Sequence, residues 1–437
     1  MPPGGVIGAA LGNRPIAIAA FLACVHRGHP FLPIDNGTTL AEISRIAGRL
    51  DVAALMLSVP RLVTKFGRHF SIDEGVTLAV ADTPPSGAVH GATILKLTSG
   101  STGLPRAVLV TESELVSDSR TLMQAMDIRA GDIQIAAIPL SHAYGVGNLL
   151  MPLLLQGTAV VMREAFVPHR VPADARAVGA RLFPGVPYMF EHFVNNPPPD
   201  GWPPTLTKLL AAGARLERDT VDRFRALFGV KVHSFYGTTE TGGICYDDSD
   251  EPVEDGTVGR PLPGVSVTLV PHEAAAAGVG RVLVHSAAVT RGYTDGGGLN
   301  AFVAGGFLTG DLGYFNDRGS LCLTGRVSSF VNIAGRKVQP DEVEQVLRTF
   351  KGCADARVIG LADVRRGEQL VAALVMTGAA PSVITLRQFC GARLASYKIP
   401  RAFVFLDAIP LTERGKTDRQ RLVAAVRELL NTQADML

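Results

Sequence analysis

Residues 93–106 read TILKLTSGSTGLPR, a strand-like segment that leads into a loop of hydroxyl groups and glycines. The six residues 98–103 hold four hydroxyl side chains and two glycines, and Arg106 follows them. Backbone N–H groups and hydroxyls in such a loop can surround phosphate oxygens. The GxxxxGK[ST] spacing of a Walker A loop is absent from the sequence. The segment therefore predicts either a phosphate-binding loop or an ordinary polar connection after a strand.

Strand and helix patterns alternate on both sides of this loop. Apolar runs at 31–34, 133–138 and 158–162 predict strands, and the stretch 145–156 predicts a helix between the last two. Residues 17–25 are apolar almost all round, which predicts a buried rather than a surface helix. Strands separated by helices indicate an α/β fold with buried sheets.

After about residue 326 the pattern changes to a compact α+β unit. Two helices and three strands are predicted there, the helices from Pro340 and Thr385 and the strands at 356–361, 370–376 and 403–406. About 110 residues are enough for an independent small domain. We therefore expect a large N-terminal domain of α/β sheets, residues 1–326, and a small, mobile α+β domain, residues 327–437.

The composition is that of a globular protein. The chain has 437 residues, of which 47% are apolar and 19% are charged. That length exceeds what one compact core holds, so two or more packing units are expected. The formal net charge is only +2, which argues against a basic surface that binds nucleic acid. The sequence offers no uncharged apolar stretch of about 20 residues to span a bilayer.

The five cysteines predict free thiols. They are odd in number, lie far apart and show neither a CxxC pair nor Cys/His ligand spacing, which argues against disulfides and a zinc site. The apolar start of the chain lacks a basic segment and is interrupted by NRP at 13–15, so a signal peptide is not expected. We therefore expect a cytoplasmic protein.

Three further segments gather polar residues. Residues 234–243 (SFYGTTETGG) combine an aromatic ring, threonines and a carboxylate. These groups could stack on a purine, bind a phosphate and hold Mg²⁺. The alternative is a polar turn after a strand at 230–233. In residues 306–313 (GFLTGDLG), Asp311 lies on a glycine-flanked turn and can bind ribose hydroxyls or form an Asx-turn. Residues 411–419 (LTERGKTDR) place a lysine on a glycine-bearing loop, where a lysine is usually solvated.

In this order, the hydroxyl-rich loop, YGTTE, TGD, GR and the late GK resemble the adenylate-forming superfamily. That superfamily includes acyl- and aryl-CoA synthetases, adenylation domains of peptide synthetases and firefly-type luciferase. The resemblance covers residues 12–422. Residues 139–145 (PLSHAYG) resemble the family's acyl-pocket segment, and residues 211–215 (AAGAR) resemble its adenine-side glycine turn. Each motif alone is weak, whereas their combination is specific.

The resemblance implies an ATP-dependent ligase that activates a small carboxylic acid to an acyl-adenylate and pyrophosphate. A thiol then takes the acyl group. Mg²⁺ is the implied cofactor, with ATP and coenzyme A as substrates. The phosphopantetheine arm of a separate carrier protein is the alternative acceptor. A nucleotide-binding homologue without catalytic activity is an alternative of a different class.

Carried over residue by residue, the resemblance implies a nucleotide site. The hydroxyl loop would hold the β- and γ-phosphates, and Thr239 would contact the α-phosphate. The glycine turn and Tyr236 would hold the adenine, and Asp311 with Arg326 would hold the ribose hydroxyls. The implied ATP- and AMP-binding set is Thr98, Ser99, Gly100, Ser101, Thr102, Gly103, Arg106, Gly213, Ala214, Arg215, Tyr236, Gly237, Thr238, Thr239, Asp311 and Arg326.

Three residues are the implied catalytic groups. Lys416 would bridge the substrate carboxylate and the α-phosphate, and Glu240 would ligate Mg²⁺. Both charges would act where a carboxylate attacks an anionic phosphate. His142 is either a participant or a satisfied wall of the pocket. Gly335 lies in a segment that resembles the small domain's loop beside the thiol tunnel.

The implied acyl pocket is a mixture of aromatic and small apolar side chains, namely Tyr144, Val186, Pro187, Tyr188 and His233. No acidic partner for an α-amino group is among them. Because an unpaired buried charge is costly, the pocket favours an aryl or medium-chain acid over a charged amino acid.

The chain departs from the family's usual pattern at several positions. Arg106 stands where lysine is usual, Ser328 stands at the hinge in place of Asp or Lys, and Asn332 stands where lysine is frequent. Family members also usually carry further structure before the segment that matches residues 4–27. A strand edge exposed by its absence would favour association with a partner or as a homodimer.

Overall fold

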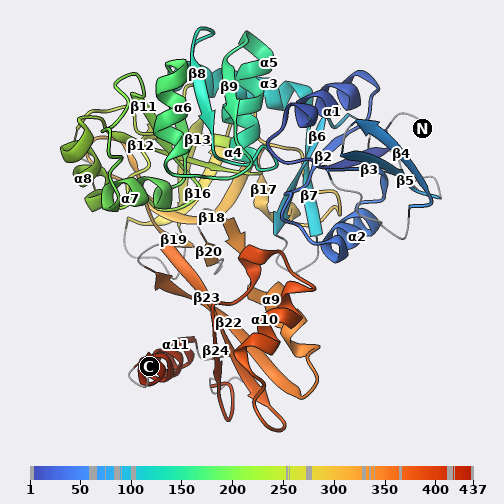
Figure 1. Ribbon diagram of the computed structural model, residues 1–437. Helices are drawn as coiled ribbons and strands as arrows, with labels where there is room; N and C mark the ends of the chain where they lie inside the picture. The colour runs from blue at the N-terminus through green and yellow to red at the C-terminus, as the bar shows by residue number, and fades with distance from the viewer. Residues whose placement is uncertain are drawn as a thin grey trace. The chain divides into compact units, whose positions relative to one another are not determined.

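Three β-sheets form the large unit of the chain, and a fourth forms the small unit (Figure 1). The computed structural model describes residues 4–58, 66–73, 75–82, 89, 91–99, 105–251, 254, 256–271, 278–326, 331–333, 336–338, 340–363, 367–410, 417 and 419–434. The large unit comprises Met1–Asn36, Ser44–Thr98 and Pro105–Ser328, and the small unit comprises Gly37–Ile43, Ser99–Leu104 and Ser329–Leu437.

The first sheet of the large unit has the strand order β4-β5-β3-β1-β2-β6-β7. Its inner strands β3, β1, β2 and β6 run parallel, and β5 and β4 are added antiparallel at one side. Its strands are β1 (Val6–Ala10), β2 (Phe31–Pro33), β3 (Val52–Leu57), β4 (Arg68–Asp73), β5 (Val76–Val80), β6 (Ile94–Ser99) and β7 (Pro105–Val110), with helices α1 (Pro15–His26) and α2 (Leu40–Arg49).

The second sheet has the order β14-β13-β12-β11-β10-β8-β9. The five neighbouring strands β12, β11, β10, β8 and β9 run parallel, and β13 pairs antiparallel with β12 in a hairpin. The strands are β8 (Ile133–Ala136), β9 (Ala159–Met162), β10 (Leu182–Gly185), β11 (Lys208–Ala211), β12 (Val232–Thr238), β13 (Gly242–Tyr246) and β14 (Arg260–Pro261). The helices are α3 (Glu112–Ala125), α4 (Ala143–Gly145), the π-helical turn η1 (Val146–Leu150), α5 (Met151–Gln156), α6 (Arg170–Val178), α7 (Pro187–Asn195) and α8 (Arg218–Phe228).

One continuous apolar core joins these two sheets. It contains Ile7 and Ala54 from the first sheet and Ile135, Phe183 and Val232 from the second. The parallel strands are apolar on both faces because both faces are covered, as is usual for parallel sheets. In such α/β folds, ligand sites lie at the carboxyl ends of the parallel strands.

The third sheet of the large unit is antiparallel, with the order β15-β16-β18-β17 and β19 paired to β18. Its elements are β15 (Ser266–Pro271), β16 (Gly280–His285), the 3₁₀ turn η2 (Leu299–Ala301), β17 (Phe302–Val303), β18 (Gly306–Phe315) and β19 (Leu321–Arg326). The long strand β18 is central because it pairs with β16, β17 and β19.

The small unit is a sheet with helices on both faces. Its strand order is β21-β20-β23-β22, and β24 pairs with β23. One face packs against α9 and α10, and the other packs against α11, as the two separate apolar clusters show. The elements are β20 (Val331–Ile333), β21 (Arg336–Val338), α9 (Pro340–Arg348), β22 (Cys353–Asp363), β23 (Gly367–Met376), α10 (Val383–Gly391), η3 (Ser396–Lys398), β24 (Ala402–Phe405) and α11 (Arg419–Ala434).

The α/β architecture with a large N-terminal and a small C-terminal part confirms the predicted fold class. The prediction of a helix buried on every side at 17–25 is wrong. Helix α1 buries Ala20, Phe21 and Cys24, whereas Leu22 is 47% exposed and Val25 is 36% exposed. One face packs on the first sheet, and the opposite face keeps its apolar side chains in solvent.

All five cysteines are free thiols. Four of them are buried, and Cys353 is partly exposed. Within the described part of the chain, no helix combines the length and the apolar composition that crossing a bilayer requires.

Candidate active site

The hairpin β12–β13 carries the YGTTE motif. The sequence pattern indicated a strand at 230–233 followed by a turn, but strand β12 continues to Thr238 and the turn occupies residues 239–241. The glycines make the tight hairpin possible, since a Cβ atom on Gly237 would lie 2.5 Å from the Gly242 carbonyl oxygen. Gly242 has a φ of +68°, which glycine adopts without strain. Thr239 and Glu240 are thereby presented at the tip.

Tyr236 and Asp311 meet although they come from different sheets. The Tyr236 hydroxyl donates a hydrogen bond of 2.7 Å to Oδ2 of Asp311, and both side chains are buried. Thr309 orients the same segment, because its hydroxyl accepts a hydrogen bond from the Asp311 N–H. Arg326 is the register partner of Asp311 across β18 and β19. The adenine and ribose candidates of the sequence therefore converge at one place.

Asp311 does not lie on a turn. It lies inside β18, so the predicted glycine-flanked turn at 306–313 is wrong. A Cβ atom on Gly306 would lie 2.6 Å from the Val284 carbonyl oxygen, and one on Gly313 would lie 2.6 Å from the Cys322 carbonyl oxygen. These glycines permit close strand neighbours rather than a turn.

Glu240 and Arg106 are linked through Tyr293, which the sequence patterns did not single out. The Tyr293 hydroxyl donates a 2.8 Å hydrogen bond to Oε1 of Glu240. The guanidinium of Arg106 lies 3.5 Å from the centre of the Tyr293 ring, and its Nη2 lies 3.5 Å from Oδ1 of Asp295. Burial and the neighbouring Glu240 carboxylate raise the pKa of Tyr293, so the phenol remains a donor. An isolated tyrosine before a glycine-rich run gives no periodic or spacing signal.

A buried lysine lies beneath the hairpin. Lys96 on β6 is 4% exposed, and its pKa is lowered by burial and raised in part by the carboxylates of Asp118, Glu114 and Glu240. Asp118 on α3 accepts a 2.8 Å hydrogen bond from the Gly243 N–H. Burial raises the pKa of Asp118, and the charge of Lys96 opposes that shift. The sequence signal was a lone lysine inside an apolar strand, two residues before Thr98.

The structure also describes three further residues of the implied nucleotide-binding set. Thr98 lies near the end of β6, and Gly213 follows β11 with a φ of +86°. Arg215 lies 3.3 Å from the Glu217 carboxylate. Strand β11 is the parallel neighbour of β12, with Ala211 in register with Ser234. The glycine turn at 212–215 therefore leaves the sheet beside the segment that carries Tyr236.

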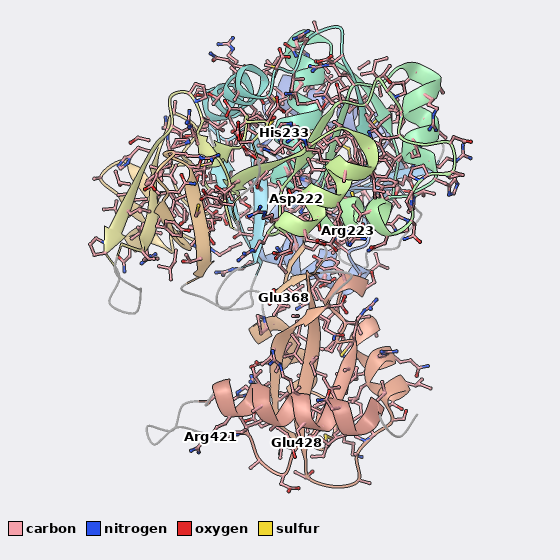
Figure 2. The ribbon with its side chains drawn as sticks, turned by 90° about the vertical axis from the view of Figure 1, so that its left-hand side faces the viewer. Asp222, Arg223, His233, Glu368, Arg421 and Glu428 are labelled. Carbon is pink, nitrogen blue, oxygen red and sulfur yellow. The ribbon has the colours of Figure 1, made fainter. Side chains whose placement is uncertain are left out.

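Some of the implied residues lie outside the described part of the chain. These are Gly100, Ser101, Thr102, Gly103, Ser328, Gly335 and Lys416. Of Ser99 and Arg326 only the backbone is described. Asn332, the residue that stands where the family often has lysine, lies on β20, and its N–H donates a 2.6 Å hydrogen bond to Oε2 of Glu368. Glu368 lies in the small unit (Figure 2).

The implied acyl pocket divides into two aromatic groups. Tyr144 packs against Phe235 with ring centres 5.6 Å apart, and its hydroxyl donates to the Leu210 carbonyl oxygen. Tyr188 on α7 packs edge-on against Phe166. The buried Val186 and Pro187 precede it, and α7 begins at Pro187. Burial raises the pKa of Tyr144 well above its ordinary value, so this hydroxyl stays neutral.

His233 lies on β12 close to the same hairpin (Figure 2). Its Nδ1–H donates a 2.9 Å hydrogen bond to the Asp247 carbonyl oxygen, and its ring lies 5.8 Å from that of Tyr246. Burial lowers the pKa of His233, so the ring is neutral near pH 7 and Nε2 is left as an acceptor.

His142 precedes α4 and faces a carboxylate. Its Nε2 lies 3.5 Å from Oδ2 of Asp35, while 43% of the His142 side chain is exposed. The imidazole is therefore partly exposed and not a fully enclosed wall, although its Nε2 is shielded from solvent. Among the described residues, no group of three or more His, Cys, Asp or Glu side chains is arranged to hold a metal ion. A metal here would need ligands other than a protein cluster, such as the phosphates of a nucleotide.

Comparison with known proteins identifies the family. The model of the AMP-binding enzyme family matches residues 1–294, and the model of the AMP-binding enzyme C-terminal domain matches residues 342–416. The chain belongs to the AMP-binding enzyme family. The adenylate-forming resemblance of its motifs is thereby confirmed.

Several relatives of this chain are CoA ligases. An indoleacetate–CoA ligase of Aromatoleum aromaticum is 26% identical over 94% of this chain and 87% of the relative. A benzoate–CoA ligase of Thauera aromatica is 31% identical over 75% of this chain and 64% of the relative. An amide bond synthetase from Marinactinospora thermotolerans superposes with a TM-score of 0.81 at 26% identity, over 97% of this chain and 90% of that chain.

These relatives agree with the predicted class of enzyme, an AMP-forming acid–thiol ligase of the acyl- and aryl-CoA synthetase type. The matched family models also account for the order of the motifs along the chain. ATP and coenzyme A fit this class as substrates.

Proposed function

We propose that this AMP-binding enzyme activates an aryl or medium-chain carboxylic acid with ATP and passes the acyl group to coenzyme A. The observation that carries the proposal is the hydrogen bond of Tyr236 to Asp311, because it joins the adenine and ribose candidates in one buried place. The glycine turn after β11 and the hairpin tip with Thr239 lie next to it in the sheet.

Within this proposal, each half of the nucleotide has its own residues. Asp311 accepts hydrogen bonds from the ribose hydroxyls, and Tyr236 lies against the adenine. Arg106 is assigned to the phosphates, and the assignment is supported by its Nε, which has no hydrogen-bond partner among the described residues. A guanidinium with open donors suits phosphate oxygens.

The reaction needs charge neutralisation rather than a general base. A carboxylic acid is already ionised near pH 7, and its oxygen attacks the α-phosphorus as pyrophosphate leaves. The ammonium of Lys416 stabilises the negative charge that gathers on the α-phosphate and the entering carboxylate. Loss of one such positive group commonly costs a factor of about 10²–10³ in rate.

Glu240 is the residue that would hold Mg²⁺. Its carboxylate lies at the hairpin tip, is partly exposed and is oriented by Tyr293. A single carboxylate together with phosphate oxygens and water is the usual coordination of Mg²⁺ with a nucleotide. When bound, the ion supplies positive charge to the phosphates of ATP.

The acyl pocket supports an uncharged side chain on the acid. Tyr144 and His233 are both neutral, as the pKa shifts described above require, and Tyr188 offers an aromatic face. An α-amino group would find no carboxylate among these residues, so its charge would be left unpaired. The aromatic acids in the names of two relatives agree with this preference.

The test is the acid-dependent exchange of labelled pyrophosphate into ATP, with a panel of aryl acids, medium-chain fatty acids and amino acids. We expect the fastest exchange with an aryl or medium-chain acid, and AMP formation on addition of coenzyme A. Exchange with amino acids alone would overturn the acid class. Nucleotide binding without any acid-dependent exchange would overturn the activity itself.

The acceptor is tested separately, with coenzyme A, a carrier protein bearing phosphopantetheine, and a simple amine. We expect thioester formation with coenzyme A. The amine is included because an amide bond synthetase is among the similar structures. Faster turnover with the carrier protein or with the amine would show that coenzyme A is not the preferred acceptor.

Three remaining expectations belong to the same proposal. The two family-model matches, at 1–294 and 342–416, support domains of residues 1–326 and 327–437. The five free thiols support a reducing, cytoplasmic environment. The outermost strand of the first sheet, β4, exposes Phe70 and Ile72, which supports a homodimer. A monomer in light scattering at high concentration would exclude the dimer.

A further inference from the structure

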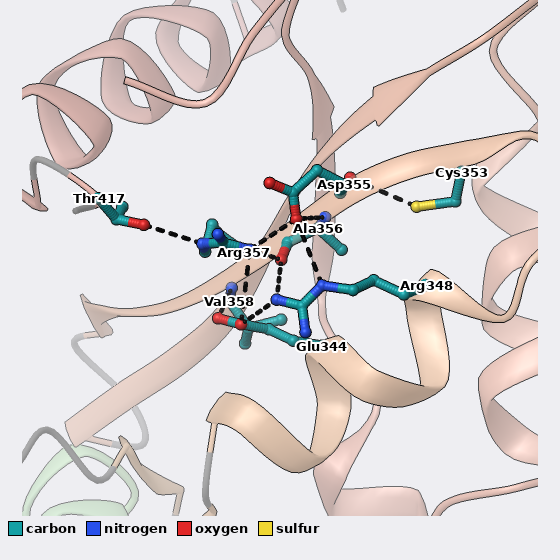
Figure 3. Close-up of polar contacts among 8 residues, drawn as sticks. All are labelled: Glu344, Arg348, Cys353, Asp355, Ala356, Arg357, Val358 and Thr417. Carbon is teal, nitrogen blue, oxygen red and sulfur yellow. Dashed lines mark hydrogen bonds and ion pairs between the residues drawn. The ribbon is translucent and has the colours of Figure 1, made fainter. Parts of the chain in front are cut away.

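A network of charged side chains ties α9 to β22 in the small unit (Figure 3). Glu344 on α9 accepts a 2.9 Å hydrogen bond from the Val358 N–H through Oε1. Its Oε2 accepts a 2.7 Å hydrogen bond from Nη2 of Arg348, one helical turn later. Arg348 also reaches the strand, where it donates to the Ala356 carbonyl oxygen and to Oδ1 of Asp355. The helix and the strand are thus fixed to each other.

Arg357 extends this network away from the helix. Its Nη1 donates to Oδ1 of Asp355 at 2.6 Å and to the Ala356 carbonyl oxygen at 2.8 Å. The same nitrogen lies 3.9 Å from Oε2 of Glu344. Two hydrogen bonds to the strand and one ion pair to the helix therefore hold one end of the guanidinium. The side chain is 24% exposed, so the contacts are only partly open to solvent.

A second nitrogen of this guanidinium reaches a residue far along the chain. Nε of Arg357 donates a 2.9 Å hydrogen bond to Oγ1 of Thr417 (Figure 3). Thr417 is a described residue that directly follows Lys416 in the sequence. Consecutive Cα atoms are about 3.8 Å apart, so a fixed Thr417 limits the positions open to the main chain of its neighbour.

We propose that Arg357 is a positioning residue for Lys416, which it acts on by holding the hydroxyl of Thr417. The inference rests on the proposed function, in which Lys416 stabilises the transition state of acyl-adenylate formation. Holding a long lysine side chain in one geometry costs conformational entropy. Anchoring the adjacent residue to the rigid sheet removes part of that cost before the substrates bind.

The proposal predicts a specific loss in one half-reaction. Thr417→Val keeps the shape of the side chain and removes the acceptor, and Arg357→Met removes the donor. Each should slow acyl-adenylate formation on the order of tenfold, since a misplacement of about 1 Å can cost up to 10²-fold. Thioester formation from preformed acyl-adenylate should change less than about twofold, because the lysine acts only in the first step. The double variant should be no slower than either single variant, because both remove the same contact.

Two controls separate positioning from stability. Thr417→Ser keeps the acceptor and should restore adenylation. Arg348→Met breaks the same network at Glu344 and Asp355 but leaves the contact with Thr417, so it should lower the melting temperature without slowing adenylation. Both half-reactions are measured on the full chain, by pyrophosphate exchange and by thioester formation from added acyl-adenylate.

The outcomes distinguish this inference from the proposed function. If Lys416→Ala adenylates as fast as the parent, the role of Lys416 fails, and the inference fails with it. If Lys416→Ala is slow while Thr417→Val matches the parent, only the inference is overturned. Equal losses in both half-reactions, or a loss in Arg348→Met as large as in Arg357→Met, would also overturn it by showing a general structural role.

Discussion

The hydroxyl of Tyr236 is bonded to the carboxylate of Asp311 at 2.7 Å, although the two residues lie 75 positions apart in the chain and in different sheets. The contact fixes one oxygen of Asp311 from the side of β12. A carboxylate accepts several hydrogen bonds, so this contact is compatible with the proposed binding of ribose hydroxyls by Asp311. The contact thus couples the hairpin of the second sheet to the nucleotide candidate on the third.

We predict that Tyr236→Phe raises the KM for ATP roughly tenfold, because the buried carboxylate loses a donor worth about 1–3 kcal/mol. The ring that we propose to lie against the adenine is retained, so binding should not be abolished. The measurement is the dependence of pyrophosphate exchange on ATP concentration. Tyr246→Phe is the matched control, since the Tyr246 hydroxyl is buried and has no hydrogen-bond partner among the described residues. A similar KM for both variants would refute the role of the contact.

The pair of Glu240 and Tyr293 predicts a dependence on Mg²⁺. Glu240→Gln should slow adenylation by about 10²–10³, as expected when a charge at the reacting phosphates is lost. Tyr293→Phe should raise the Mg²⁺ concentration for half-maximal rate, because the carboxylate loses the 2.8 Å hydrogen bond that orients it. Both are measured by titrating Mg²⁺ in the exchange assay. Tyr314→Phe, a change at an exposed tyrosine, should leave the titration unchanged.

Burial of His233 predicts a loss of stability in acid. Its pKa is lowered in the folded chain, so the unfolded chain binds a proton first as the pH falls below the ordinary value of about 6.5. The free energy of unfolding should not change above the ordinary histidine pKa. It should decrease as the pH falls from that value to the lower pKa of His233 in the folded chain. Urea unfolding followed by the fluorescence of Trp202, the single tryptophan, measures this in the large unit. His233→Gln should show a weaker decrease on acidification, and an identical decrease would contradict the prediction.

The buried charges under the hairpin predict a coupled effect on stability. Lys96→Met leaves Asp118 without its opposing charge and should lower the free energy of unfolding by about 3–5 kcal/mol. Lys96→Met combined with Asp118→Asn should cost less than the sum of the single changes, because the pair is then removed together. Trp202 fluorescence in urea again provides the measurement. Strictly additive losses would show that the two groups do not interact.

The polar residues of the site were predictable where they stand in compact motifs. Tyr236, Glu240 and Asp311 lie in short segments whose residue types suit a nucleotide, and the structure brings Tyr236 and Asp311 into contact. Tyr293 and Lys96 gave no such signal, because each stands alone in its segment. Their relation to Glu240 arises only when β6, the hairpin and the loop at 290–298 come together in the fold.

The strands around the glycines were harder to predict. Glycines at 306, 310 and 313 suggested a turn, yet β18 pairs with strands on both sides. The glycines are needed in β18 because carbonyl groups of the neighbouring strands approach closely there, and a side chain would clash with them. A sequence pattern does not report such a close approach. The helices of the small unit were clearer, since Val343 and Leu347 repeat with helical spacing and are both fully buried in α9.

The thiols offer a way to follow the small unit in solution. Cys353 is the one partly exposed cysteine of the five, and it begins β22, the strand that also holds Arg357. A maleimide fluorophore should therefore attach there first, without replacement of the other four. Burial raises the pKa of the Cys353 thiol, so labelling should accelerate as the buffer is made more alkaline. Changes in emission during turnover would then report when the small unit alters its surroundings.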